Sequence, residues 1–206
     1  MKNDDEMAVI GLDVETGGLY PTTDALLSVG AWATWDGTGR EFLVHVDPDT
    51  QPGKEIAAKA AEVNGYTRER WQQAGQQPLL TAMAWLSEWI AAKKEQRPAA
   101  VLVCHNLAFD RAFMAESERV SGYTLPGRYD WRCSMVEMAR QMDVGLLPKG
   151  SASLQRLGEL SGFWQEHGWR GETHEALEDA RCAAWGWQWL AENARAGGEP
   201  ELKEVA

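Results

Sequence analysis

Two carboxylates follow the first apolar segment of the chain. Asp13 and Glu15 stand two residues apart in DVETGG, directly after the apolar run MAVIGL at 7–12. Side chains two apart in a strand share a face, so both carboxylates are expected on one face, with Leu12 and Val14 on the other. Two buried negative charges repel each other, and a divalent cation with oxygen ligands is their natural partner. The same short pattern also occurs in solvated turns, so the pair alone leaves both interpretations open.

Two later segments carry residues of the same kinds. HNLAFDRAF places Asp110 in the first turn of a predicted helix, and THEALEDA places His174 and Asp179 around the start of the last one. Each has a plain structural interpretation, since a carboxylate near a helix N-terminus is favoured by the helix dipole. Residues five apart on one helix point about 140° apart. The two residues of the last segment can therefore face one site only if His174 lies in the loop before the helix.

The elements that must position these residues follow from hydrophobic patterning. Strands are expected at 7–12, 26–35, 40–46, 98–106 and 131–133. The first three are expected to be antiparallel, with DGTG at 36–39 as a hairpin signal, and the fourth has the continuous apolar character of a parallel strand. Helices are expected at 55–63, 79–93, 107–120, 134–142, 153–160 and 175–195, with a loop over 63–71. This order predicts an α/β fold with a mixed sheet.

The bulk composition indicates one domain. The 206 residues suffice for a single core, with a flexible lead-in at 1–6, a domain at 7–196 and a disordered acidic tail at 197–206. No apolar stretch is long enough to cross a membrane, and the first residues do not resemble a secretory signal. A cytoplasmic protein without a membrane partner is therefore expected. The eleven tryptophans are expected mostly in the core, among them Trp85, Trp89 and Trp187.

Charge and cysteine content exclude some classes of protein. The net charge of −11 disfavours a broad cationic surface for nucleic acid, but it allows a local grip on a strand end. The three cysteines, Cys104, Cys133 and Cys182, are scattered, which argues against a disulfide framework and against a thiolate zinc site. They are expected to be reduced thiols.

In this order and at these separations, DVET, HNLAFD and HEALEDA resemble the motifs of the DEDDh 3′→5′ exonucleases. That superfamily includes the proofreading epsilon subunit of bacterial DNA polymerase III, ribonuclease T and oligoribonuclease, and the resemblance covers about residues 7–190. It implies a ribonuclease H-like fold, with a central mixed sheet flanked by helices. It also implies hydrolysis of phosphodiesters at 3′ ends to nucleoside 5′-monophosphates. The residues implied are Asp13, Glu15, Asp110 and Asp179 as ligands of two divalent ions, Mg²⁺ or Mn²⁺, and His174 as general base.

Substrate contacts are expected around the same motifs. Glycines allow close approach to a phosphate or sugar, and apolar side chains can stack on bases. Asn64 precedes a glycine in VNGYT, where the resemblance places a His or Asn that touches the terminal nucleotide. Burial in the core and a simple Asn-Gly turn are the alternative interpretations. The substrate-binding residues expected are Thr16, Gly18, Leu19, Asn64, Asn106 and Phe109.

The motifs leave the substrate and the assembly open. They serve DNA and RNA alike, and a single-stranded DNA end is favoured here over RNA. The alternatives are an RNA-trimming exoribonuclease of the ribonuclease T or oligoribonuclease type, and a proofreading subunit that works inside a polymerase complex. A homodimer is also compatible. A catalytically dead binding protein is disfavoured because all five acidic and histidine positions are filled.

Overall fold

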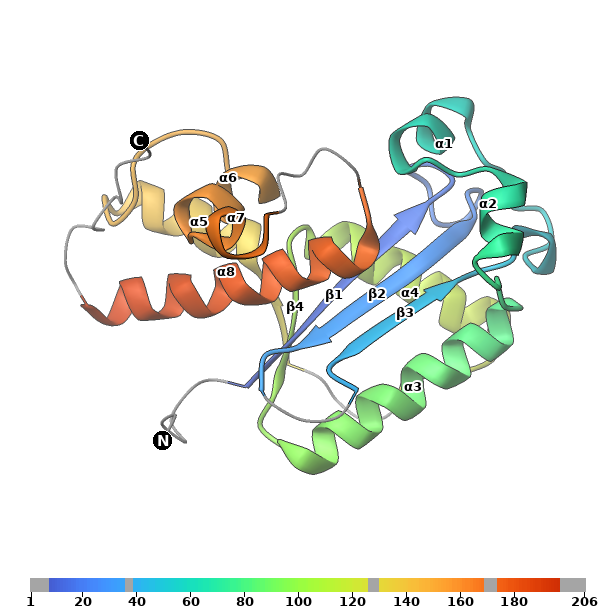
Figure 1. The fold of residues 1–206 in the computed structure, drawn as a ribbon, viewed down its shortest axis with the longest axis horizontal. Helices are drawn as coiled ribbons and strands as arrows, with labels where there is room; N and C mark the ends of the chain where they lie inside the picture. The colour runs from blue at the N-terminus through green and yellow to red at the C-terminus, as the bar shows by residue number, and fades with distance from the viewer. Residues whose placement is uncertain (1–7, 36–38, 126–129, 169–173, 197–206) are drawn as a thin grey trace.

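Five strands form one sheet at the centre of the molecule (Figure 1). The computed structural model describes residues 8–35, 39–125, 130–168 and 174–196, so the expected lead-in, tail and hairpin turn at 36–38 lie outside the described residues. The sheet order is β3-β2-β1-β4-β5, with β1 to β3 antiparallel and β4 and β5 parallel to β1. The strands are β1 (Val9–Thr16), β2 (Leu26–Ala33), β3 (Glu41–His45), β4 (Val101–Cys104) and β5 (Trp131–Cys133). The expected mixed sheet is thus confirmed.

Helices cover both faces of this sheet. Helices α3 and α4 lie on one face, and α8 lies on the other with α5, α6 and α7 packed beside it (Figure 1). The helices are η1 (Pro48–Thr50), α1 (Ala58–Asn64), α2 (Arg68–Gln73), α3 (Leu79–Gln96), α4 (Leu107–Ser121), α5 (Ser134–Asp143), α6 (Leu154–Leu160), α7 (Phe163–His167) and α8 (Ala176–Ala196). Among the residues that the structure describes, none of these helices combines the length and the apolar character needed to cross a membrane.

The loop expected over 63–71 is wrong in its second half. Gly65 ends α1 in the left-handed conformation (φ 65°), and α2 then begins behind Thr67, whose hydroxyl accepts a hydrogen bond from the Arg70 backbone N–H. Trp71 anchors this short helix because its indole N–H donates to the Leu27 carbonyl at 2.7 Å in a buried position. A capping residue and one buried tryptophan therefore suffice for a helix too short to show a hydrophobic period.

One face of β1 builds the main core. Ile10, Leu12 and Val14 alternate along the strand and pack with Leu86 of α3 and Phe113 of α4 in one apolar cluster. All five are buried. This face of the strand contributes to stability through the removal of apolar surface from water.

The other face of β1 lies directly under α8. A Cβ atom on Gly11 would stand 2.0 Å from the Ala180 carbonyl oxygen, and one on Gly30 of β2 would stand 2.2 Å from the Ala176 carbonyl carbon. Helix backbone therefore touches strand backbone at two points, which only glycine permits. This contact sets the first turns of α8 over the end of β1.

The apolar stripe expected on α8 is largely present. Ala180, Ala184 and Leu190 are buried, and Leu177 and Trp187 are half-buried.

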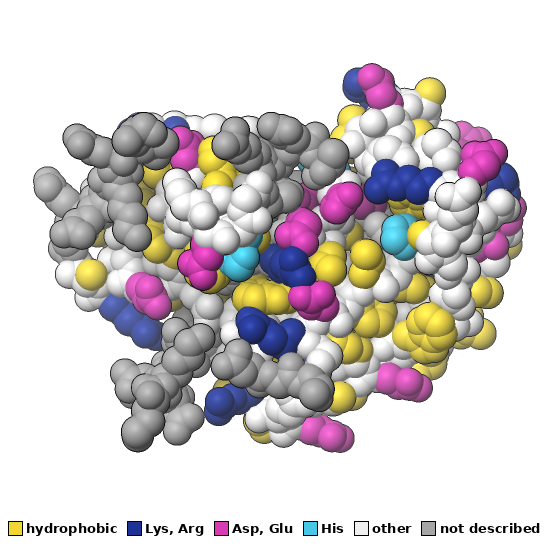
Figure 2. All heavy atoms as spheres, in the orientation of Figure 1, with side chains coloured by type: hydrophobic (Ala, Val, Ile, Leu, Met, Phe, Trp, Pro, Cys, Tyr) yellow, Lys and Arg dark blue, Asp and Glu magenta, His cyan; other side chains and the backbone are white. Residues whose placement is uncertain are grey.

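The expectation that most tryptophans lie in the core is wrong at Trp85, which is 47% exposed because it lies on the outer side of α3. Figure 2 shows hydrophobic side chains on the face beside α8, over β3 and α3.

Candidate active site

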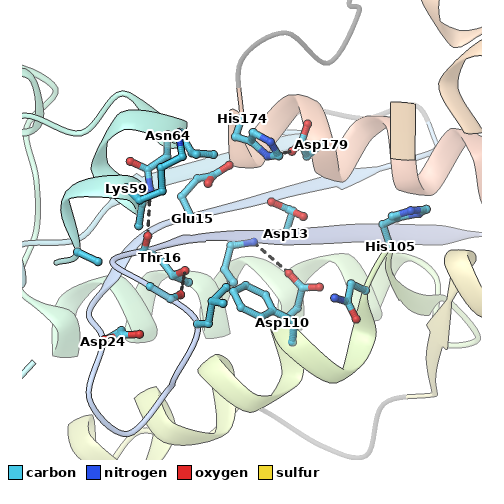
Figure 3. A pocket seen from close by; sticks show the side chains of 18 of the residues that line it. Asp13, Glu15, Thr16, Asp24, Lys59, Asn64, His105, Asp110, His174 and Asp179 are labelled. Carbon is cyan, nitrogen blue, oxygen red and sulfur yellow. Dashed lines mark hydrogen bonds and ion pairs between the residues drawn. The ribbon is translucent and has the colours of Figure 1, made fainter. Parts of the chain in front are cut away.

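A cavity of about 700 Å³ opens at the C-terminal end of β1, between the loop that follows this strand, α1, α4 and the start of α8. Residues from distant parts of the chain meet in it (Figure 3). The five residues expected to do the chemistry all line it: Asp13, Glu15, Asp110, His174 and Asp179. The structure thus brings together three motifs that are far apart in the sequence.

The strand β1 supplies two of the carboxylates. Asp13 pairs with Gly30 and Glu15 with Ser28 in the antiparallel register with β2. Figure 3 shows both carboxylates on the side of β1 that faces His174 and Asp179. The shared face expected from the period of a strand is therefore observed.

Asp110 reaches the cavity from the opposite side of β1. The parallel pairing of β1 with β4 ends at Gly11 and Val103, so the Val14 N–H has no strand partner on that side. Its hydrogen bond goes instead to Asp110 Oδ1, at 3.2 Å. Asp110 is 3% exposed in the first turn of α4. The end of one strand pairing thus creates the anchor for the third carboxylate.

His174 lies in the loop before α8, as the geometry requires. The helix begins at Ala176, so the angle between residues of one helix does not constrain His174, and its imidazole points toward Asp179. Its Nδ1 lies 3.6 Å from Asp179 Oδ2, and the two side chains are 57% and 6% exposed. The geometric prediction for this segment is confirmed.

Burial and mutual repulsion perturb the charges of the cavity. Burial raises the pKa of Asp13 well above its usual range, and the nearby Asp110 and Asp179 raise it further. Burial, with Asp179 next in weight, raises the pKa of Glu15 to about 8. Burial likewise raises the pKa of Asp110 to about 7, against the lowering effect of the Val14 hydrogen bond. The protein alone therefore stabilises these carboxylates poorly in their charged form.

The donor set fits divalent cations. Glu15, His174 and Asp179 each offer a ligand atom, and these atoms lie within 4.8 Å of one another among the described residues. Glu15 Oε1 and Asp179 Oδ1 are buried without a hydrogen-bond partner. Asp13 and Asp110 lie outside that group but line the same cavity. Buried oxygen atoms without partners are costly unless a cation or donor meets them, and hard cations prefer oxygen ligands.

The residues expected to bind substrate also line this cavity: Thr16, Gly18, Leu19, Asn64, Asn106 and Phe109. Some of them have structural tasks as well. The Asn64 amide donates to the Thr16 carbonyl at 2.9 Å and its oxygen accepts from the Tyr66 N–H. A Cβ atom on Gly18 would stand 2.2 Å from Asp24 Oδ2. The turn interpretation thus holds for Asn64, and contacts with a nucleotide stay a prediction for all six.

An apolar rim on this cavity was not predicted as a whole from the sequence. The rim consists of Leu19, Tyr20 and Val63, which are 73%, 69% and 45% exposed and come from the loop after β1 and from α1. Only Leu19 was expected here. Tyr20 directly follows it in TGGLY, but nothing in the sequence indicates that α1 folds back to place Val63 beside them.

His105 is a second residue that sequence analysis did not single out. It precedes Asn106 in HNLAFD and lines the cavity at the end of β4. Its Nε2 lies 3.0 Å from the Ala152 carbonyl and its Nδ1 3.0 Å from the Ser134 hydroxyl. Burial lowers the pKa of His105 to about 4. A neutral imidazole therefore ties the segment before α6 to the wall of the cavity.

Comparison with known proteins agrees with this geometry. A family model described as the 3′-5′ exoribonuclease Rv2179c-like domain matches residues 8–191. The 3′-5′ DNA exonuclease Cap18 of Escherichia coli is 30% identical over 114 residues, which cover 55% of this chain and 58% of that protein. The PolC-type DNA polymerase III of Thermotoga petrophila is 26% identical over 196 residues, which cover 94% of this chain and 12% of that protein.

Solved structures share the fold. Exonuclease I of E. coli, in a complex with a dT13 oligonucleotide, matches with a TM-score of 0.70 and 15% identity, over 92% of this chain and 42% of that one. Cell-death related nuclease 4 matches with a TM-score of 0.66 and 14% identity, over 90% of this chain and 64% of that one. These likenesses confirm the ribonuclease H-like fold. The chain spans less than two thirds of each of these relatives.

Proposed function

The chain belongs to the 3′-5′ exoribonuclease Rv2179c-like domain family, and from that premise we propose that it is a metal-dependent 3′→5′ exonuclease. The carrying observation is the convergence of four carboxylates and one histidine on a single cavity of about 700 Å³, where Glu15 Oε1 and Asp179 Oδ1 are buried without partners. Such orphaned oxygen atoms are the expected trace of a cation site. The family match supports the exonuclease reaction, and the carboxylate and imidazole groups of the cavity support a dependence on metal ions.

The proposed reaction breaks the last phosphodiester of a strand. A water oxygen attacks the phosphorus of this phosphodiester, and the bond to the 3′-oxygen of the preceding nucleotide breaks. That oxygen takes up a proton from water to become the new 3′-hydroxyl, and a nucleoside 5′-monophosphate is released. Asp13, Glu15, Asp110 and Asp179 would hold two divalent ions, Mg²⁺ or Mn²⁺, whose charge stabilises the attacking and leaving oxygens.

His174 is proposed to accept the proton of the attacking water. Its Nδ1 faces Asp179 at 3.6 Å, which leaves Nε2 to take the proton. The Asp179 carboxylate raises the pKa of His174, so the imidazolium is stabilised once it forms. At 57% exposed, the side chain is open to water.

The apolar rim favours the binding of an unpaired strand end. Leu19, Tyr20 and Val63 present exposed apolar surface at the mouth of the cavity, and unpaired bases can stack on such surface without regard to sequence. We propose single-stranded DNA as the substrate, in line with the activity of Cap18 and with the oligonucleotide bound by Exonuclease I. The description of the family favours the second candidate, single-stranded RNA.

A time course with strands labelled at either end tests the proposal. Single-stranded DNA, duplex DNA and RNA are incubated with Mg²⁺, Mn²⁺ or chelator. Shortening from the 3′ end of single strands in the presence of metal is expected, with DNA cleaved faster than RNA. Faster cleavage of RNA selects the second candidate. Shortening from the 5′ end, or undiminished activity in chelator, contradicts the proposal.

Substitution of the proposed general base, His174, gives an independent check. His174→Ala is expected to lower the rate about 10²- to 10⁴-fold, since that is the usual contribution of a general base. The matched control is His167→Ala on α7, which does not line the cavity. Equal rates in the two variants would remove His174 from the proposed role.

A second copy of the chain or a polymerase as partner stays a prediction. The likeness to a PolC-type polymerase covers 12% of that protein, which motivates the polymerase alternative. Light scattering on the purified chain would reveal a dimer. Activity of the chain alone would show that no partner is needed for hydrolysis.

A further inference from the structure

A second cavity, of about 310 Å³, lies beside α8 and shares no lining residue with the catalytic cavity. Helix α8 runs back across the sheet from the end of β1 (Figure 1). The second cavity lies further along this helix, where Trp185, Trp189 and Glu192 line it. Three indoles and three charged side chains define its chemistry: Trp32, Trp185, Trp189, Arg40, Glu166 and Glu192. Its volume is within the range of small-molecule sites, roughly 300 to 1,000 Å³.

The indoles are held in place by neighbouring groups. The Trp185 indole N–H donates to the Ser161 carbonyl at 3.1 Å. Trp189 follows four residues later and so lies on the same side of α8. Trp32, at the end of β2, is 8% exposed, and the Arg40 guanidinium lies 4.7 Å from its ring centroid. The Trp185 indole is therefore held at the cavity with Trp189 beside it on α8, and the Trp32 ring lies next to the Arg40 guanidinium.

The carboxylates that line the cavity favour a ligand with N–H donors. Glu166 and Glu192 line the cavity as exposed side chains, and neither carboxylate forms a hydrogen bond or ion pair with another described residue. An ionised carboxylate accepts hydrogen bonds and donates none. Figure 2 shows acidic and basic side chains interleaved along α8 on this face of the molecule. A flat ligand with amino or imino groups on its edge would satisfy the indoles and the carboxylates together.

Charge narrows the choice of ligand. Two carboxylates against one guanidinium disfavour a phosphate inside the cavity. A small organic cation is also disfavoured, because Arg40 already places a positive charge over Trp32. We propose that this cavity binds a nucleobase that carries amino or imino donors, with guanine the best match because two adjacent donors fit one carboxylate.

The base can come from a free nucleotide or from a strand. Asp179 and Trp189 are ten residues apart on α8, or about 15 Å along its axis. An unpaired nucleotide upstream of a 3′ end in the catalytic cavity could span that distance, and this source rests on the proposed exonuclease function. A nucleoside 5′-monophosphate supplies the same chemistry without any strand.

Calorimetric titration of the full chain in chelator with guanosine 5′-monophosphate tests the proposal. Its affinity is expected to exceed that of uridine 5′-monophosphate, and to fall about tenfold or more in Trp189→Ala, as for the loss of one stacking contact. The control Trp85→Ala removes an exposed indole on α3 and is expected to change nothing. Asp13→Asn is expected to retain the binding, which separates this site from the catalytic one.

A second variant keeps the test decisive if Trp189→Ala does not fold. Glu192→Gln alters an exposed side chain and is expected to abolish the preference for guanine over uracil. Equal affinity for both nucleotides in the wild type, or binding unchanged in Trp189→Ala and Glu192→Gln, would overturn the proposal. So would binding of inorganic phosphate or spermidine in place of the nucleotides.

Cleavage kinetics distinguish the two sources of the base. If a strand supplies it, Trp189→Ala raises KM for a long guanine-containing oligonucleotide and leaves KM for a dinucleotide unchanged. If only free nucleotides bind, both KM values stay at the wild-type level while the affinity for guanosine 5′-monophosphate falls. An inactive protein would refute the exonuclease function, and the titration would still decide the binding site.

Discussion

On the face of β1 that packs against α3 and α4, Ile10, Leu12 and Val14 are buried among apolar side chains. On the face under α8, the half-buried Asp13 and the buried Glu15 carry carboxylates with raised pKa values, and Glu15 Oε1 has no hydrogen-bond partner. A single strand thus carries apolar core side chains on one face and the proposed metal ligands on the other. Substitutions on the two sides should therefore affect different measurements.

The largest expected effect is that of Asp13→Asn on the rate. Removal of one proposed metal carboxylate should lower the rate of 3′-end hydrolysis about 10³-fold, the scale of losing a group that stabilises transition-state charge. Without metal, the Asp13→Asn variant should unfold at the same temperature as the wild type or higher, since the cost of burying a charged group and the repulsion from Asp110 and Asp179 are both relieved. The control is Asp143→Asn, an exposed carboxylate paired with Lys149. A lower melting temperature with full activity would reverse the comparison.

On the opposite face, Leu12→Ala should act on stability instead. Leu12 is fully buried, and a cavity of this kind costs about 2–5 kcal/mol of unfolding free energy. Activity per folded molecule, measured well below the midpoint of denaturation, should remain close to wild type. Leu80→Ala, at a 55% exposed position, is the control for loss of a leucine without a cavity. A loss of activity without a loss of stability would show that the two faces are not separate.

Gly11→Ala is expected to lower stability and activity together. The new methyl group would meet the Ala180 carbonyl oxygen at 2.0 Å, so α8 must move away from the sheet. The expected cost is about 1–3 kcal/mol of stability, with a partial loss of activity because Asp179 moves with the helix. Denaturant titration and the exonuclease assay measure the two effects. Wild-type values in both assays would mean that the close contact between α8 and β1 is not needed.

The smallest expected effect is a pH dependence confined to the carboxylate face. Burial raises the pKa of Glu15 from 4.5 to about 8, so between these pH values the folded protein binds a proton that the unfolded chain has released. Stability in chelator should therefore fall as pH rises from 4.5 to about 8 and level off above. Asp110, with its pKa raised to about 7, acts in the same direction.

Melting temperatures in chelator across this pH range measure that effect. A decline of a few degrees is expected, shallower in Glu15→Gln, and opposed by Mg²⁺ or Mn²⁺ because binding to the folded state stabilises it. A melting temperature that rises over this range in chelator would contradict the raised pKa values of these carboxylates.

Local patterns in the sequence were enough for much of this site. The period of a strand predicts that Asp13 and Glu15 share a face, and the angle between residues of a helix predicts that His174 must precede α8. Both are properties of neighbours in the chain, and both are observed. The order of the strands along the chain also follows from apolar runs and turn signals, which are local as well, whereas the position of β4 beside β1 in the sheet does not.

Contacts between distant segments could not be predicted in this way. Helix α2 escaped because a six-residue helix shows no period, and its anchor is the Trp71 hydrogen bond to Leu27, 44 residues away. Two residues of the rim escaped because only the fold brings Val63 to the same cavity as Tyr20. No pattern distinguishes an exposed Trp85 from a buried tryptophan at the same helical spacing.

The sequence by itself determined the motifs, the faces on which their side chains lie and the family to which they belong, since these depend on residue type and on spacing along one element. Only the tertiary structure decided which oxygen atoms lack partners, how closely α8 lies on Gly11 and Gly30, and that a second cavity gathers three indoles from two elements. The physical reason is that burial and hydrogen-bond pairing depend on every segment that surrounds a group, whereas backbone periodicity depends only on its own.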